Sequence, residues 1–149
     1  MSSVLLYIAL QTFSVLAALF ALVKGGKGER WAAGVVLLNL VIGTSAAVIT
    51  RQNVEIVRLA NDGLAATALL VITLRYGAFW LGAAMLLFAA GFAVHSFYIV
   101  TERALDLPYV VINVISWNGL IWCLIIGTII AWTRRIRGAR AAATPAPAA

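Results

Sequence analysis

The chain has 149 residues, of which 64% are hydrophobic and only 11% are charged, and its mean hydropathy is +1.03. A soluble domain of this length would carry about 25% charged residues to cover its surface, so the composition excludes a soluble globular fold and predicts an integral membrane protein. The net charge of +6 does not indicate nucleic-acid binding, because the basic residues cluster between apolar runs instead of forming one basic surface.

Five apolar runs follow one another along the chain. Each is about 20 residues long, enough for a helix to cross the ~30 Å hydrocarbon core of a bilayer. No Lys or Arg precedes the first run, which we expect to be a retained helix and not a cleaved signal. The runs are Val4–Val23, Trp31–Thr50, Val54–Leu74, Ala78–Val100 and Tyr109–Trp132.

The third run leaves two interpretations open. Its first half carries Glu55, Arg58, Asn61 and Asp62, and only its second half is uninterrupted apolar sequence. It is either a full membrane span or a half-buried helix at the membrane surface.

The distribution of Lys and Arg favours five spans. If all five runs cross, eight of the eleven basic residues fall on one side, and only Arg51, Arg58 and Arg103 fall on the other. If the third run does not cross, the best division is seven against four. Basic connections stay in the cytoplasm, so the sequence predicts an all-α bundle of five transmembrane helices with the N-terminus outside and the C-terminus inside.

The boundaries of the bundle are also predicted. Trp and Tyr residues lie near both ends of the runs, as in an aromatic belt. The short Arg75-Tyr76-Gly77 segment predicts a tight antiparallel hairpin between the third and fourth helices. We expect one transmembrane domain over residues 1–137 and a disordered Ala/Pro-rich cytoplasmic tail over residues 138–149.

Catalytic signatures are missing from the sequence. It contains no HExxH, no GxSxG and no Walker A motif, while His95 is its single histidine and Cys123 its single cysteine. We therefore expect a protein that is not an enzyme and has no metal site and no cofactor. Haem ligation through His95 is the least favoured alternative, since a second histidine ligand is not present.

Polar residues inside the runs gather at one depth. At 1.5 Å per residue, five polar side chains on four of the helices lie roughly 6–14 Å below the outer face: Gln11, Asp62, His95, Asn113 and Asn118. Thr44, Ser45, Ser96 and Ser116 lie at a similar depth. An ionised Asp62 needs a partner in hydrocarbon, and Arg58, one turn earlier, is the expected one. The candidate ligand-binding residues are Gln11, Arg58, Asp62, His95, Asn113 and Asn118.

Two interpretations of this polar layer remain. It is either a pocket or ion site open to the outside, or a satisfied polar core that fixes helix register.

The segment from Leu59 to Thr128 resembles a group of small uncharacterised alphaproteobacterial membrane proteins. It carries Asp62, then Leu74-Arg75-Tyr76, Phe79-Trp80-Leu81, His95, Tyr109, Trp117 and Ile126-Gly127-Thr128. The usual proline after the turn tryptophan is absent. The resemblance implies a multi-pass protein of the bacterial inner membrane and implies no activity.

The leading functional hypothesis is a non-enzymatic inner-membrane protein, either an accessory subunit of a larger membrane complex or a small bundle that forms homo-oligomers. Its expected surroundings are the lipid bilayer and no nucleic acid. The alternative is a transporter or sensor of a small solute or ion that uses a polar pocket in the outer half of the bilayer.

Overall fold

The computed structural model describes residues 3–49, 54–104 and 106–143. Over these ranges the chain forms five α-helices and no strand, which confirms the all-α prediction. The helices are α1 (Ser3–Lys24), α2 (Lys27–Ile49), α3 (Val54–Tyr76), α4 (Phe79–Val100) and α5 (Leu107–Ala143).

Among the described residues, four helical segments are long and apolar enough to cross a membrane: Leu5–Lys24, Val54–Tyr76, Phe79–Val100 and Leu107–Arg140. The third run, which the sequence left open, is one of them. α2 is not among the four, and its first turn carries three charged residues. Beyond that turn, residues 32–49 of α2 contain no charged residue.

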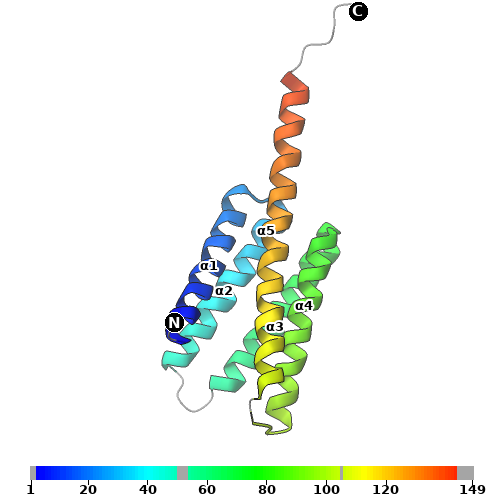
Figure 1. Cartoon of the computed structure of the whole chain (residues 1–149). Helices are drawn as coiled ribbons and strands as arrows, with labels where there is room; N and C mark the ends of the chain where they lie inside the picture. The colour runs from blue at the N-terminus through cyan, green and yellow to red at the C-terminus, as the bar shows by residue number, and fades with distance from the viewer. Residues whose placement is uncertain (1–2, 50–53, 105, 144–149) are drawn as a thin grey trace, which may run out of the picture.

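The helices form a closed ring in which each helix runs opposite to the next along the chain, whereas α1 and α5, which close the ring, run in the same direction (Figure 1). α1 packs on α2 and α5, α3 packs on α2 and α4, and α4 packs on α5. α2 also touches α5 across the ring. Because the number of described helices is odd, the start of α1 and the end of α5 lie at opposite ends of the bundle.

One half of the ring is filled by a packed apolar core. The core includes Ala18 and Val36, which are 0% and 2% exposed, together with Leu69, Ile121 and Leu124. These positions belong to the later half of α1, the first half of α2, the later half of α3 and the middle of α5. Alanines on α1 and α2 let the helix backbones approach closely.

The same half contains tight glycine contacts between α4 and α5. A Cβ atom on Gly127 would lie 2.3 Å from the Trp80 ring, and one on Gly119 would lie 2.8 Å from Leu87. The Trp80 indole therefore occupies space that only glycine leaves open. Gly127 therefore lies on the contact face between α5 and α4.

The turn between α3 and α4 is as short as predicted. α3 ends at Tyr76 and α4 begins at Phe79. Gly77 between them has φ of 60°, and its backbone N–H donates to the Thr73 carbonyl at 2.9 Å. This left-handed glycine closes the C-terminus of α3 and reverses the chain.

Basic residues collect at the core-filled end, here called the basic end: Lys24, Lys27, Arg30, Arg75, Arg134 and Arg135. The Arg135 guanidinium donates to the backbone carbonyl of Lys24, at the C-terminus of α1. The Lys24 ammonium lies 5.4 Å from the centre of the Trp132 ring. These contacts fasten α5 to the α1–α2 turn.

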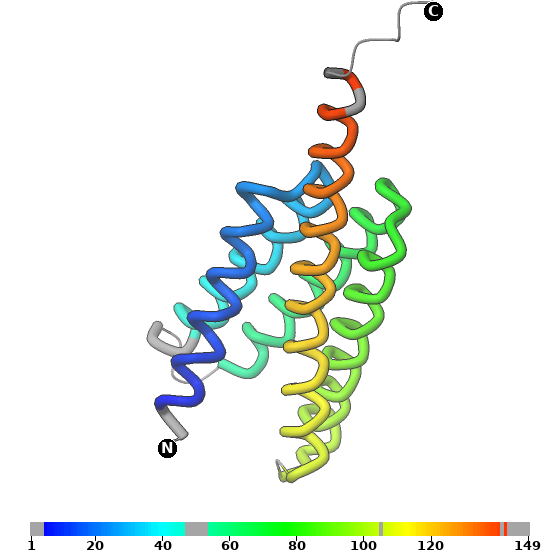
Figure 2. The backbone as a smooth tube through the Cα atoms, turned by 45° about the horizontal axis from the view of Figure 1, so that its top comes forward, coloured from blue at the N-terminus to red at the C-terminus, as the bar shows by residue number. Residues whose placement is uncertain are grey.

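α5 has 37 residues and runs past the other helices at the basic end (Figure 2). The expectation of disorder from Gly138 is wrong for residues 138–143, which continue this helix. Alanine and arginine favour helix, and a helix already nucleated by packing extends easily. Residues 144–149 of the predicted tail lie outside the described residues.

Candidate functional site

The other half of the ring encloses a pocket with a volume of about 440 Å³. All five helices line it, because the ring there has no apolar core between them. Its walls are formed by Tyr7, Leu10, Gln11, Asn39, Leu40, Gly43, Thr44, Arg58, Asn61, Asp62, Phe88, Gly91, Phe92, His95, Asn113, Val114, Ser116, Trp117 and Asn118.

The structure brings every candidate residue named from the sequence to this one pocket. Of the four hydroxyl residues expected at the same depth, Thr44 and Ser116 also line it. Ser45 and Ser96 do not, and the Ser96 hydroxyl donates to its own helix at the Phe92 carbonyl. The pocket-lining candidates are Gln11 from α1, Arg58 and Asp62 from α3, His95 from α4, and Asn113 and Asn118 from α5.

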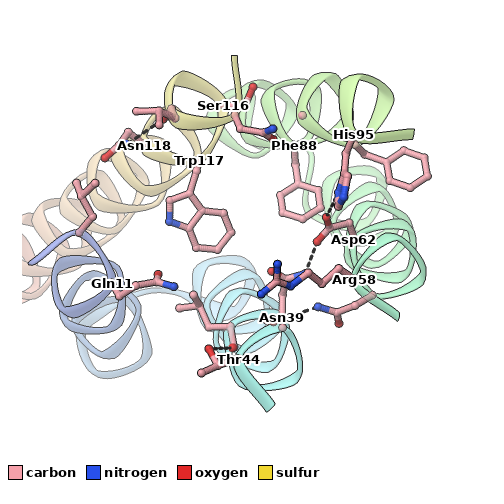
Figure 3. A pocket seen from close by; sticks show the side chains of 18 of the residues that line it. Gln11, Asn39, Thr44, Arg58, Asp62, Phe88, His95, Ser116, Trp117 and Asn118 are labelled. Atoms are coloured by element: carbon pink, nitrogen blue, oxygen red, sulfur yellow. Dashed lines mark hydrogen bonds and ion pairs between the residues drawn. The ribbon is translucent and has the colours of Figure 1, made fainter. Parts of the chain in front are cut away.

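Asp62 is the centre of a hydrogen-bond network that joins three helices (Figure 3). Its Oδ1 accepts from the Asn39 amide of α2 at 3.0 Å, and its Oδ2 lies 3.2 Å from Nδ1 of His95 on α4. The Asn61 amide donates to the Asn39 carbonyl at 3.0 Å. Both carboxylate oxygens of Asp62 are therefore occupied.

The expected pairing of Arg58 with Asp62 is wrong. In the described parts of the chain, the ion pairs are His95 with Asp62 and Arg103 with Asp106. Asp62 turns toward the neighbouring helices α2 and α4, where Asn39 and His95 meet it. An arginine that precedes its acid by one turn is also the weaker order for a helical ion pair.

Arg58 instead extends into the pocket (Figure 3). Over the described residues, its guanidinium forms no ion pair and no hydrogen bond. Glu55, on the preceding turn of α3, is exposed and is not within ion-pair distance of it. The pocket therefore contains an arginine whose donors are not used by the described protein.

The opposite wall is aromatic and held in place. The Trp117 indole N–H donates to the Ser14 hydroxyl at 3.0 Å, and this hydroxyl in turn donates to the Leu10 carbonyl. Phe88, 9% exposed, also projects into the pocket (Figure 3). A fixed indole and a buried phenyl ring in one pocket offer rigid apolar surface at low entropic cost.

The amides on this side differ in availability. The Gln11 amide donates to the Tyr7 hydroxyl at 3.0 Å, and the Asn118 amide donates back to its own helix at the Val114 carbonyl. Gln11 points toward the interior of the pocket in Figure 3. We infer that Gln11 is better placed than Asn118 to meet a bound molecule.

The edge of the site near α5 is organised by Asp106, which precedes the first residue of that helix. Its Oδ1 accepts from the Tyr109 backbone N–H at 3.1 Å and from the Tyr98 hydroxyl, and the Arg103 guanidinium lies 2.9 Å from its Oδ2. The hydrogen bonds from Tyr98 and then from Tyr109 hold the pKa of Asp106 below its ordinary value of 3.8. This N-cap starts α5 and places Tyr109 against the ring of His95, with centroids 6.2 Å apart.

Several site residues were not found from the sequence. Asn39 is an isolated amide within an apolar run, and that polar interruption was the available signal. The sequence marks Trp117 only through its place in the resemblance, and Ser14 and Asp106 give no signal beyond their residue type.

The pocket brings charged, polar and aromatic side chains together. Over the described residues, no three His, Cys, Asp or Glu side chains gather closely enough to hold a metal ion. The pocket offers a guanidinium, a carboxylate–imidazole pair, several amide side chains and aromatic walls.

No protein-family model, curated protein or solved structure matches this chain. Its function has to follow from the geometry of the pocket.

Proposed function

We propose that the chain is a multi-pass membrane protein that binds a small solute in this pocket, as a transporter or a sensor. The observation that supports it most directly is that all five helices contribute to one cavity, with a network-bound Asp62 and an unpaired Arg58 in its wall. Pockets of roughly 300–1,000 Å³ with apolar walls and a few converging polar groups are typical of small-molecule sites.

The proposal includes an orientation. The connections at the basic end carry most of the Lys and Arg residues, which the positive-inside rule assigns to the cytoplasm. All five helices then cross the membrane, α2 included, because α2 lies antiparallel between α1 and α3. The N-terminus and the pocket face the outside, and the proposed location is the bacterial inner membrane.

The packed core argues against a permanently open channel. Below the pocket, Leu69, Ile121 and Leu124 are each no more than 1% exposed. A transporter would have to repack these side chains to release a solute inward, as alternating-access proteins do. A sensor would need only a small shift of the helices around the pocket.

The hypothesis of an accessory subunit in a membrane complex stays a prediction. A polar layer that served only to fix helix register would be expected to satisfy its own polar groups. Arg58 lines the pocket, is exposed there and forms no ion pair with a described residue, so it contributes nothing to helix register, and this favours the binding hypothesis.

A pair of glycines on α2 allows a sharp test. Gly43 lines the pocket, and a Cβ atom there would meet only the Asn61 amide, at 3.9 Å. A side chain can therefore begin at this position without a backbone clash, and a leucine there is expected to occupy part of the pocket. Gly34, on the same helix, is exposed and meets nothing within 4 Å, so Gly34→Leu is the matched control.

The measurement is the thermal stability of the protein in lipid nanodiscs, with a panel of small carboxylates, amines, sugars and neutral aromatic compounds. At least one class is expected to raise the melting temperature of the wild type and of Gly34→Leu, and to leave Gly43→Leu unchanged. If every class affects Gly43→Leu as it affects the wild type, the pocket is not a binding site and the proposal is wrong.

A further inference from the structure

The arginine in the pocket indicates what kind of solute it binds. A guanidinium presents five N–H donors in a planar fork, and none of those on Arg58 is used by the described residues. Asp62 does not supply a partner, because Asn39 and His95 occupy its two oxygens. Arg58 is exposed at the mouth of the pocket, and the ligand group that best matches its fork is a carboxylate or phosphate group.

The polar and apolar parts of the pocket are separated along its depth. Arg58 lies in the second turn of α3, near the open end of the ring, whereas Phe88 lies midway along α4, next to the packed core. Trp117 on α5 is one turn closer to the core than Asn113. A molecule with its charge at one end fits this arrangement with the charge toward the mouth.

We propose, on the basis of the function proposed above, that the ligand is a small organic oxyanion with an aromatic or branched apolar body. Its carboxylate or phosphate is bound by Arg58, and its body packs between Phe88 and Trp117. The volume of about 440 Å³ is roughly three times that of a 150 Å³ cavity that holds benzene. This allows one ring with a short acidic side chain.

The same oxyanion chemistry can arrive from two sources. One is a soluble aromatic acid that enters from the outer face, and the other is an anionic lipid whose headgroup reaches Arg58 from the membrane. The experiment therefore varies both the soluble probe and the lipid.

The probes are 3-phenylpropionate and its neutral isostere 3-phenylpropanamide, measured by calorimetry and thermal stability in phosphatidylcholine nanodiscs. The variants are Arg58→Gln, Arg58→Lys and Arg75→Gln. Arg75 is the matched control because it is an exposed arginine at the other end of the same helix. Arg58 has no partner to lose, so Arg58→Gln is expected to fold, and an unchanged melting temperature without probe verifies this.

The wild type and Arg75→Gln are expected to bind the carboxylate roughly 10–100-fold more tightly than the amide, the range for one charge-assisted contact. Arg58→Gln should lose this preference, and Arg58→Lys should retain only part of it, since lysine keeps the charge but not the fork. Equal binding of acid and amide, or an unchanged preference in Arg58→Gln, would overturn the inference.

Phosphatidylglycerol nanodiscs distinguish the two sources. If this lipid raises the melting temperature in an Arg58-dependent way and displaces 3-phenylpropionate, the oxyanion is a lipid headgroup. If the soluble acid binds equally in both lipids, the ligand is a solute. A third outcome separates the two proposals. If a neutral or cationic probe binds, and Gly43→Leu abolishes its binding while Arg58→Gln does not, the pocket binds a solute but the oxyanion inference is wrong.

Discussion

His95 on α4 and Asp62 on α3 face each other across the wall of the pocket, with Nδ1 of the imidazole 3.2 Å from Oδ2 of the carboxylate. Asn39 completes the contact from α2, so one acidic side chain links three consecutive helices. This junction lies where the ring has no apolar core to hold it together.

Replacing Asp62 by alanine is expected to destabilise the protein by about 1–3 kcal/mol, the usual cost of leaving polar partners unsatisfied. The stranded groups are the Asn39 amide and the His95 ring, not Arg58. Reversible unfolding in mixed micelles measures the loss. In double-mutant cycles, Asp62→Ala should couple to His95→Ala and be additive with Arg58→Ala. Strong coupling between Asp62→Ala and Arg58→Ala would instead support the ion pair expected from the sequence and contradict this network.

Gly127→Ala is expected to destabilise the contact between α4 and α5 by about 1–3 kcal/mol, the typical cost of overpacking. The new methyl group would lie 2.3 Å from the Trp80 indole. Gly34→Ala, which meets nothing within 4 Å, is the matched control and should be neutral or slightly stabilising. Trp80→Leu should reduce the penalty at Gly127, and a penalty of equal size at both glycines would contradict this account of the contact.

Membrane-impermeant thiol labelling tests whether α2 crosses the bilayer. In a Cys123→Ala background, Lys27→Cys and Arg75→Cys should both react only from the cytoplasmic side, and Thr101→Cys only from the outside. Lys27 and Arg75 are exposed and are separated by α2 and α3. If only α3 crosses, these two cysteines will react from opposite sides.

Acid is expected to loosen the start of α5. The pKa of Asp106 is lowered in the folded protein, so its stabilising contribution is present above the unfolded value near 3.9 and is lost as the pH falls through the lower folded pKa. Hydrogen exchange of the Tyr109 and Val110 amides should accelerate below about pH 4 relative to the rest of α5. Asp106→Asn should exchange quickly at all pH values and remove the pH dependence.

The membrane bundle and the position of the polar layer could be predicted because they depend on regular geometry. A fixed rise per residue places Gln11, Asp62 and His95 at one depth once the helix ends are known, and polar side chains at that depth avoid lipid. The pocket lined by these residues follows from the same counting.

The partner of Asp62 could not be predicted in this way. Sequence spacing identifies neighbours on the same helix, such as Arg58, whereas the bonds to Asn39 and His95 depend on how three helices are rotated against one another. The helical continuation of α5 past Gly138 was missed for a different reason. An Ala/Pro-rich composition is typical of disorder, although alanine also extends a helix that packing has already started.

The division of the ring into an open half and a packed half also decides where the membrane voltage acts. In the proposed orientation, water can enter the pocket from outside, whereas the core around Ile121 and Leu124 excludes it. Moving one charge through the full potential involves about 2.3 kcal/mol per 100 mV, and most of that drop falls across the packed half. An anion that binds at Arg58 from outside therefore crosses little of the field, and its affinity should hardly change with voltage. Movement of the anion past Ile121 would cross most of the field, so that step should account for nearly all of the voltage dependence of transport.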